Sequence, residues 1–325
     1  MQLGFWNKFK KPIYALAPMA NVTDAAFRRL IAKYGKPDVT WTEFVSVDGL
    51  CSEQGRERLI HDFWYTEAER PIVAQIFGSK PDNFYEIAKL IKKLGFDGID
   101  INMGCPDRSV EKQGAGAALI KNFDLAKEII TATKKGAQDL PVSVKTRIGY
   151  NSNIIEKWIP NLVEAEPAAI TIHGRTRKEM SLVPAHWDII SQAVTLIKHV
   201  NPKITVLGNG DVENLSQAKA KVDEYKVDGV MIGRGIFGNP WLFSNRTTPI
   251  SLNEKLAVMI EHTLLYEQLF KDRKSFDVMK KHYKAYVTGF EGASQLRAKL
   301  FETKNGREVI DIVKQHYPEA VPVHA

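Results

Sequence analysis

Residues 98–106 read Gly-Ile-Asp-Ile-Asn-Met-Gly-Cys-Pro, and the interpretation of the whole chain starts from them. The first five residues carry two isoleucines bounded by turn residues, which predicts a β-strand. The Gly-Cys-Pro sequence predicts a corner, because glycine permits a sharp bend and proline blocks regular structure beyond it. We therefore expect the thiol of Cys105 on a loop at the mouth of a strand, where it can transfer a proton or act as a nucleophile. The alternative is that Cys105 is only a small buried hydrophobe.

Apolar segments of the same kind recur from residue 13 to about residue 243, separated mostly by helical patterns such as 82–94 and 124–136. The connection 46–70 is long and polar, so its helix is less well defined. Eight buried strands with crossovers predict an α/β fold of the (β/α)8 TIM-barrel class, and an open doubly wound sheet is the alternative. The predicted strands are 13–17, 39–44, 72–77, 98–102, 142–146, 169–173, 204–207 and 229–232.

The alternation of strands stops at Phe243, and Pro249 marks a linker. Residues 252–317 have helical patterns with a glycine-rich break at 289–292. We therefore predict a catalytic barrel domain over residues 1–248 and a small C-terminal all-helical domain over residues 249–325.

The bulk properties predict a cytoplasmic protein with no membrane span and no bound metal. The chain has 325 residues, of which 44% are hydrophobic, but no apolar run reaches membrane-spanning length. Its two cysteines, Cys51 and Cys105, cannot form a disulfide scaffold or a zinc site by themselves. The net charge of +7 permits a nucleic-acid partner without requiring one.

Polar residues occur at the end of nearly every predicted strand. In a TIM barrel the active site lies at the carboxyl ends of the strands, so these residues should converge on one rim. They include Ala17-Pro18-Met19, Gln75, Asn102, Lys145, Arg147, His173, Arg175, Asn209-Gly210-Asp211 and Gly233-Arg234. Each one has an alternative explanation as a helix cap or a turn residue.

The ends of the last two strands predict a phosphate site. Residues 208–210 and 233–235 are glycine-rich, so their backbone N–H groups can approach an anion, and Arg234 adds a positive charge. Residues 233–238 also match G-x-G-x-x-G, but no further strand comes after them to complete a dinucleotide-binding βαβ unit. A mononucleotide phosphate is therefore the better interpretation.

Lys145 ends a strand that should be buried, and a buried lysine is costly unless it meets an anion. A reduced flavin ring is such a partner. Alternatively, the lysine reaches solvent from the rim.

The motifs together resemble those of the tRNA-dihydrouridine synthases, flavoenzymes that reduce uridine in tRNA. The resemblance covers residues 13–243 and continues in the helical part at 289–293 with Leu296 and Arg297. Residues 107–116 are more acidic and glycine-rich than expected for the common bacterial branch, which leaves the target uridine open. The matching segments are 17–19 with Thr23-Asp24, 75–78, 100–106, 144–147, 172–177, 208–211 and 233–235.

The resemblance implies that NADPH reduces FMN, that flavin N5 delivers hydride to C6 of uracil, and that Cys105 protonates C5. The base must leave its stack, which costs a few kcal/mol. By resemblance, the flavin ring or its chain would be held by Ala17, Pro18, Met19, Gln75, Lys145 and His173. The ribityl phosphate would be held by Asn209, Gly210, Asp211, Gly233 and Arg234. Asn102 and Arg147 would hold the uracil, and Arg175 and Arg177 would serve either FMN or RNA.

The helical part carries a basic segment. Residues 271–307 contain ten Lys or Arg against four acidic residues. In this context we expect RNA backbone contacts, although a solvated face is the alternative. The expected contacts are Lys280, Lys281, Lys284 and Arg297.

Two other functions are compatible with parts of the sequence. A dihydroorotate dehydrogenase-like flavoenzyme would share the barrel and the cofactor but would need no basic helical domain. A non-catalytic RNA-binding protein would need neither Cys105 nor Lys145, and it would purify without a yellow cofactor.

Overall fold

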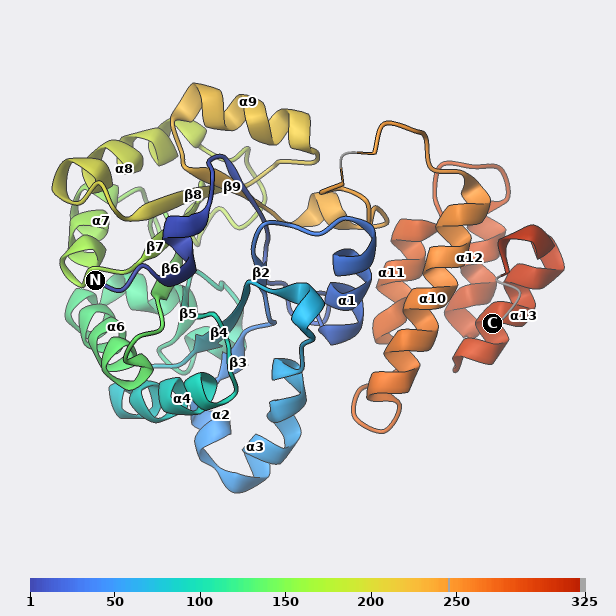
Figure 1. The fold of residues 1–325 in the computed structure, drawn as a ribbon, viewed down its shortest axis with the longest axis horizontal. Coiled ribbons are helices and arrows are strands. Elements are labelled where there is room, and N and C mark those ends of the chain that lie inside the picture. Colours follow the sequence, from blue (N-terminus) through green and yellow to red (C-terminus); the bar gives the residue numbers. More distant parts are fainter. Residues whose placement is uncertain (245, 322–325) are drawn as a thin grey trace. The chain divides into compact units, whose positions relative to one another are not determined.

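The computed structural model describes residues 1–244 and 246–321. The chain forms two compact units, drawn with the course of the chain in Figure 1. The first contains residues 1–20 and 37–235, and the second contains residues 21–36 together with those from 236 onward. Over the described residues, no helix combines the length and the apolar character that crossing a bilayer requires.

The first unit is a barrel of parallel strands. The hydrogen-bonded order is β1-β9-β8-β7-β6-β5-β4-β2, and β3 also pairs with β4. Backbone bonds from Leu16 N to Val39 O (3.2 Å) and from Asp38 N to Tyr14 O (2.9 Å) join the first strand to the segment before β2 and close the ring. The predicted fold class is confirmed. The strands are β1 (Ile13–Leu16), β2 (Thr40–Trp41), β3 (Val45–Ser46), β4 (Ile72–Phe77), β5 (Gly98–Met103), β6 (Val142–Arg147), β7 (Ala169–His173), β8 (Thr205–Asn209) and β9 (Gly229–Ile232).

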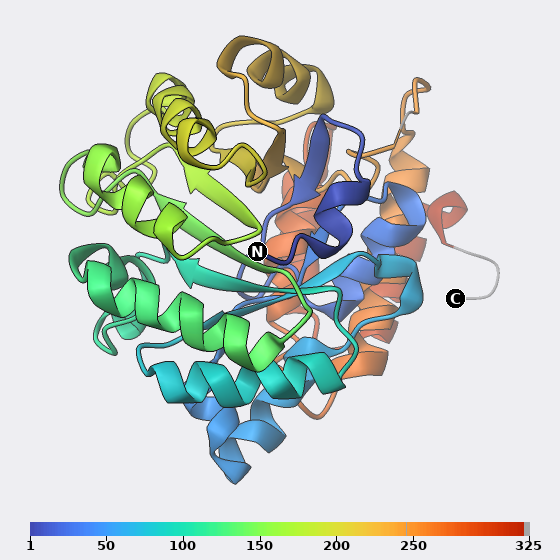
Figure 2. The same ribbon diagram turned by 60° about the vertical axis from the view of Figure 1, so that its left-hand side comes forward.

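Amphipathic helices surround the strands. In α4, for example, Phe84, Ile87, Ala88 and Ile91 are buried, which is the spacing of one helix face. Figures 1 and 2 show α4, α6, α7, α8 and α9 outside the ring of strands. The helices of this unit are α2 (Val47–Cys51), α3 (Glu53–Leu59), α4 (Pro81–Lys93), α5 (Arg108–Glu111), α6 (Phe123–Ala137), α7 (Ile155–Glu164), α8 (Trp187–Val200) and α9 (Leu215–Tyr225). Short 3-10 turns occupy Gly4–Lys8, Ile60–Phe63, Glu67–Glu69, Gly116–Lys121 and Arg234–Ile236.

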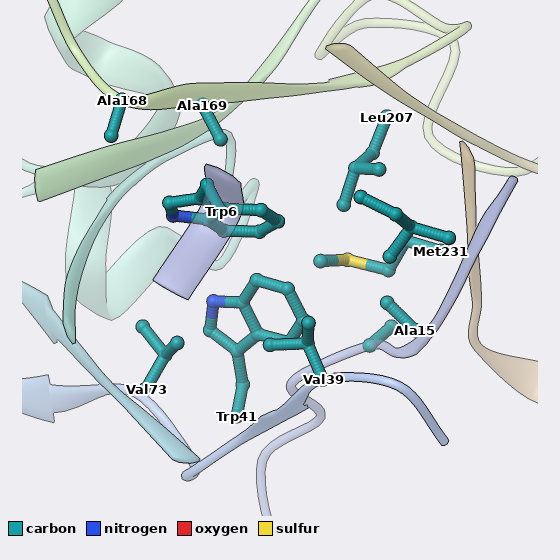
Figure 3. Packing of buried hydrophobic residues seen from close by; sticks show 11 residues of the cluster. Trp6, Ala15, Val39, Trp41, Val73, Ala168, Ala169, Leu207 and Met231 are labelled. Carbon is teal, nitrogen blue, oxygen red and sulfur yellow. The ribbon is translucent and has the colours of Figure 1, made fainter. Parts of the chain in front are cut away.

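An apolar cluster fills the barrel from the end where the strands begin, and two of its residues, Ala17 and Met231, reach the cavity at the other end. Because side chains alternate along a strand, every second residue points inward. Trp6, from the turn before β1, packs against Trp41 with 6.1 Å between ring centroids. Figure 3 shows the two indoles among inward residues of several strands. The cluster contains Ile13, Ala15, Ala17, Val39, Val73, Ala168, Ala169, Leu207 and Met231 beside the two tryptophans.

Two predicted strands needed correction. The segment 39–44 is not one strand, because the Thr42 hydroxyl accepts the N–H of Gln75 (3.1 Å) and interrupts the ladder between β2 and β3. The strand predicted to end at Leu207 continues to Asn209. Gly208 lies inside this strand and does not form a turn. A Cβ at this position would lie 2.3 Å from the Trp187 ring, so the glycine allows close packing.

The second unit is helical, as predicted. Helix α1 belongs to it and packs on α10, where Lys33 and Tyr34 both bond to Glu261 at 2.6 Å. The predicted catalytic domain 1–248 therefore contains residues of both compact units, and the assignment of functions to 1–248 and 249–325 stays a prediction. The helices are α1 (Ala25–Tyr34), α10 (Leu252–Phe270), α11 (Val278–Tyr286), α12 (Ala293–Glu302) and α13 (Gly306–His316), with a 3-10 turn after them at Pro318–Ala320.

Candidate active site

A cavity of about 860 Å³ opens at the carboxyl ends of the strands. Twelve residues of the predicted site line it, and they come from five strand ends and the loops after them. Gln75, Asn102, Cys105 and Arg177 lie outside this lining. The lining includes Ala17, Pro18, Met19, Lys145, Arg147, His173, Arg175, Asn209, Gly210, Asp211, Gly233 and Arg234.

Lys145 is fixed by its neighbours in the barrel. Its Nζ donates to Oδ1 of Asn209 (3.1 Å), and Nδ2 of Asn209 donates to the Met231 carbonyl (2.8 Å). Burial, and then the charge of Arg147, lower the pKa of Lys145 to about 8. The lysine is therefore a cation near neutral pH. Its position in the cavity lining allows it to pair with a bound anion.

His173 is neutral. Burial, and then the charges of Arg147 and Lys145, lower the pKa of His173 well below its usual value. Nη1 of Arg175 lies 3.2 Å from Nε2 of His173. A guanidinium can only donate, so Nε2 must accept and Nδ1 must carry the proton.

Asp211 forms ion pairs with two arginines that line the cavity. One of its oxygens accepts from Arg175 and from the Ala185 N–H (2.8 Å), and the other accepts from Arg234 (3.0 Å). Desolvation opposes ionisation here, but these bonds, that from Arg175 first, bring the pKa of Asp211 below its usual value. The Asp211 carboxylate therefore orients cations, and its charge would repel a phosphate.

Gly210, Gly233 and Arg234 bring their backbone N–H groups to the same cavity, which these residues line. Among the described residues, the N–H groups of Gly210, Gly233 and Arg234 make no backbone hydrogen bond outside the helices and the strand ladders. Gly210 has φ +131°, a conformation that favours glycine. A Cβ on Gly235 would lie 2.8 Å from the Glu213 backbone, so this glycine lets the two loops approach each other. Such N–H groups beside Arg234 form a suitable cradle for an anion.

The Cys105 loop is fixed by the side chain of Asn102. Oδ1 of Asn102 accepts the N–H groups of Gly104 (3.1 Å) and Cys105 (2.9 Å), while its Nδ2 donates to Gln75 (3.1 Å). Gly104 does not have a positive φ, and glycine is favoured because a Cβ would crowd the Thr146 backbone at 3.2 Å. Burial raises the pKa of the Cys105 thiol, so it keeps its proton at neutral pH.

Gln75 and Asn102 are buried and do not line the cavity. Their exposed fractions are 0% and 6%. Nε2 of Gln75 donates to Asp100 (2.6 Å), and burial raises the pKa of Asp100 to about 6. In this structure both amides are part of the hydrogen-bonded support of the Cys105 loop.

Arg175 and Arg177 diverge, although they are two residues apart. Arg175 points to Asp211 in the cavity, whereas Arg177 bonds to Glu111, with Nε 2.9 Å from both carboxylate oxygens. Glu111 was missed by the sequence analysis, because its partner is 66 residues away. Met180 was missed as well, since nothing local distinguishes it from other loop residues.

Arg147 joins the two loops beside the cavity. Its Nε donates to the Gly104 carbonyl (2.7 Å), and its Nη1 donates to Thr176 O (3.1 Å) and Met180 O (3.4 Å). The side chain thus ties the Cys105 loop to the loop after β7.

The four predicted cations of the helical unit differ in their surroundings. Lys281 and Lys284 are exposed. Lys280 pairs with Asp277 (2.6 Å), and Arg297 donates to the Val287 carbonyl (2.7 Å) at the end of α11. No group of three or more His, Cys, Asp or Glu side chains able to hold a metal occurs within residues 1–244 and 246–321.

Comparison with known proteins identifies the family. The model of the family described as dihydrouridine synthase matches residues 15–322. The chain belongs to the dihydrouridine synthase family. It is accordingly an oxidoreductase.

The relatives are similar over nearly their whole length. A probable tRNA-dihydrouridine synthase of Staphylococcus aureus (strain COL) is 38% identical over 328 residues, covering 99% of both chains. Probable tRNA-dihydrouridine synthase 2 of Bacillus subtilis (strain 168) is 39% identical and covers 95% of both. Among solved structures, a mutant morphinone reductase in complex with tetrahydroNAD is 12% identical, with a TM-score of 0.50 over 74% of this chain and 87% of that one. At that identity, the likeness shows a shared fold.

Proposed function

We propose that this protein reduces the C5=C6 bond of specific uridines in tRNA to give 5,6-dihydrouridine, with FMN as cofactor and NADPH as reductant. Family membership supports the reaction and a flavin, and the names of the relatives support tRNA as the substrate. The observation that carries the proposal is the polar cavity at the strand ends together with the thiol of Cys105, whose neighbour Pro106 lines that cavity. We propose the cytoplasm as its location.

The residues at the cavity fit a flavin mononucleotide. About 860 Å³ is within the range of cofactor sites. When bound, the flavin supplies the hydride that uracil receives. The N–H groups of Gly210, Gly233 and Arg234 would hold the phosphate, with Asn209 supporting them. Asp211 would act by orienting Arg175 and Arg234. Lys145 and His173 would face the ring or its chain, with Ala17, Pro18, Met19 and Gln75 completing the proposed set.

Cys105 would donate the proton to C5. A proton donor must hold its proton at working pH, and burial has that effect on the Cys105 thiol. Asn102 would fix the loop that carries the thiol, and Arg147 would hold that loop against the loop after β7. A uracil at the cavity mouth would then meet Arg147, and Asn102 would act on the uracil through the Cys105 loop that it holds.

The helical domain 249–325 would hold the tRNA backbone. Lys281 and Lys284 are exposed and suited to phosphate contacts. Lys280 and Arg297 belong to the proposed set but already have partners within the chain.

The test uses the purified protein with unmodified tRNA and NADPH. We expect a yellow protein that releases FMN on denaturation, judged against FMN and FAD standards, and that forms dihydrouridine in the tRNA. Release of FAD would refute the cofactor assignment. A protein that oxidises NADPH but leaves tRNA unchanged while reducing a free pyrimidine would refute the substrate assignment.

A further inference from the structure

A second cavity of about 700 Å³ adjoins the first. The two share Pro106 and Met180, and Pro106 directly follows Cys105 in the chain. The second cavity is lined by Pro106, Asp107, Arg108, Ser109, Lys112, Arg177 and Met180. All of these residues belong to the barrel unit.

The lining is positively charged. It contains Arg108, Lys112 and Arg177 against the single carboxylate of Asp107. Arg108 and Lys112 are exposed, and within the described part of the chain neither makes an ion pair. Asp107 is turned to its own helix, where Oδ1 accepts the Ser109 N–H at 2.8 Å. Arg108 and Lys112 are therefore available to an anionic ligand.

Arg177 is already oriented before any ligand binds. Its Nε and Nη2 bond to Glu111, whose side chain is only 10% exposed. The guanidinium also lies over the Tyr150 ring, 5.4 Å from the centroid. Within the described residues, its Nη1 makes no hydrogen bond. An anion can therefore bind at Nη1 without the entropic cost of ordering the side chain.

An apolar tip stands at the rim. Met180 and Leu182 are 42% and 84% exposed, on the loop after β7. The loop is not loose, because Arg147 binds Met180 O, Arg175 binds Val183 O (2.6 Å), and Glu179 meets His186 at 3.1 Å. A fixed apolar tip beside a cationic cavity suits a nucleotide, which has an apolar base face and an anionic phosphate.

We propose that the second cavity binds the phosphodiester group next to the target uridine, with the neighbouring base against Met180. This inference rests on the proposed function. A uridine that reaches Cys105 brings its own flanking phosphates toward the second cavity, where Arg108 and Lys112 neutralise one of them and Arg177 donates a hydrogen bond to it. The pyrophosphate of NADPH has the same chemistry, so the test separates the two sources.

The first experiment compares R108A/K112A with the matched control K93A/K203A. The control residues are exposed and lie just before β5 and β8, at the opposite end of the barrel. In R108A/K112A we expect the tRNA Kd to rise roughly tenfold and the salt slope to fall by about 1–2, while the control keeps both. An unchanged Kd and slope in R108A/K112A would overturn the inference. So would a raised KM for NADPH, in flavin reduction without tRNA, with tRNA affinity intact.

The second experiment locates the phosphate. A neutral methylphosphonate is placed in turn at each linkage flanking the mapped target uridine. One position should weaken binding to the parent enzyme and have little further effect in R108A/K112A, as expected for groups in direct contact. Fully additive losses at every position would overturn the inference. Failure of the parent enzyme to form dihydrouridine would instead refute the proposed function itself.

Discussion

The two ends of the barrel interior differ in chemistry although the same strands build them. Where the strands begin, Trp6 and Trp41 pack among aliphatic side chains. Where they end, Lys145, His173 and Asn209 point to a polar cavity. On β8, for example, Leu207 is in the apolar cluster, and Asn209, two residues on, lines the cavity.

The difference shows how stability and chemistry are separated along each strand. Buried apolar surface stabilises the fold by roughly 25 cal/mol per Å². A buried charge at the other end opposes folding, as the lowered pKa of Lys145 indicates. We therefore expect substitutions at the apolar end to change stability and substitutions at the polar end to change reactivity.

The largest expected effect is that of Cys105→Ala. Loss of a general acid slows a reaction by roughly 10²–10⁴-fold, so uridine reduction should fall by that factor. Flavin content, NADPH oxidation and the unfolding free energy should stay close to those of the parent. Cys51→Ala is the control, since Cys51 is an exposed thiol on α2. Equal loss of flavin reduction and uridine reduction in Cys105→Ala would make Cys105 structural.

Trp41→Ala should have the opposite profile. Truncating a buried tryptophan costs about 3–5 kcal/mol of unfolding free energy, and Trp41 is 1% exposed. Denaturant unfolding measures the loss, and kcat per folded molecule should be retained. A substantial loss of kcat per folded molecule would contradict the separation of stability and reactivity between the two ends of the barrel. Trp41→Phe, which keeps a ring against Trp6, should lose less.

Lys145→Met should stabilise the flavin-free protein at pH 7 while weakening cofactor binding. The pKa of Lys145 is about 8 in the folded chain against an ordinary value of 10.5. Between these values the unfolded chain binds more protons, so the stability of the parent rises as pH increases from about 8 to about 10.5. Below that window both states are protonated, and the folded state bears the full cost of the buried charge.

We therefore expect Lys145→Met to gain roughly 1–3 kcal/mol at pH 7 and to lack this rise with pH. Denaturant unfolding at several pH values measures both effects, and the exposed Lys93→Met serves as the control. If the unfolding free energies of Lys145→Met and the parent change with pH in parallel, Lys145 does not carry a costly buried charge at the polar end of the barrel.

The smallest effect concerns cations outside both ends of the barrel. K281A/K284A should weaken tRNA binding and lower its salt slope by about 1–2, with flavin content unchanged. Arg297 is left in place, because its bond to Val287 O supports the end of α11. K36A/K314A removes the same charge from exposed positions of the helical unit outside the basic segment 271–307 and should keep the parent slope. Identical slopes in both double variants would show that the Lys281 face is only solvated.

Strand alternation and the rule for barrel strand ends made the fold and part of the site predictable from the sequence. Lys145, His173 and Asn209 were found in this way, because parallel strands bring their carboxyl ends to one rim. Contacts between distant loops were not predictable. Arg175 and Arg177 look equivalent in sequence, but their carboxylate partners are 36 and 66 residues away. The interruption between β2 and β3 at Thr42 was not predictable either. There the Thr42 hydroxyl, in place of a backbone carbonyl, accepts the Gln75 N–H.

The central claim is that the polar end of the barrel reduces uridine in tRNA through Cys105. Mapping dihydrouridine in tRNA from cells that lack this protein, complemented with the parent gene or with Cys105→Ala, tests it most directly. We expect one or more positions to lose dihydrouridine in the deletion strain, to regain it with the parent, and to remain unmodified with Cys105→Ala at equal protein level. Full restoration by Cys105→Ala, or unchanged dihydrouridine in the deletion strain, would contradict the claim.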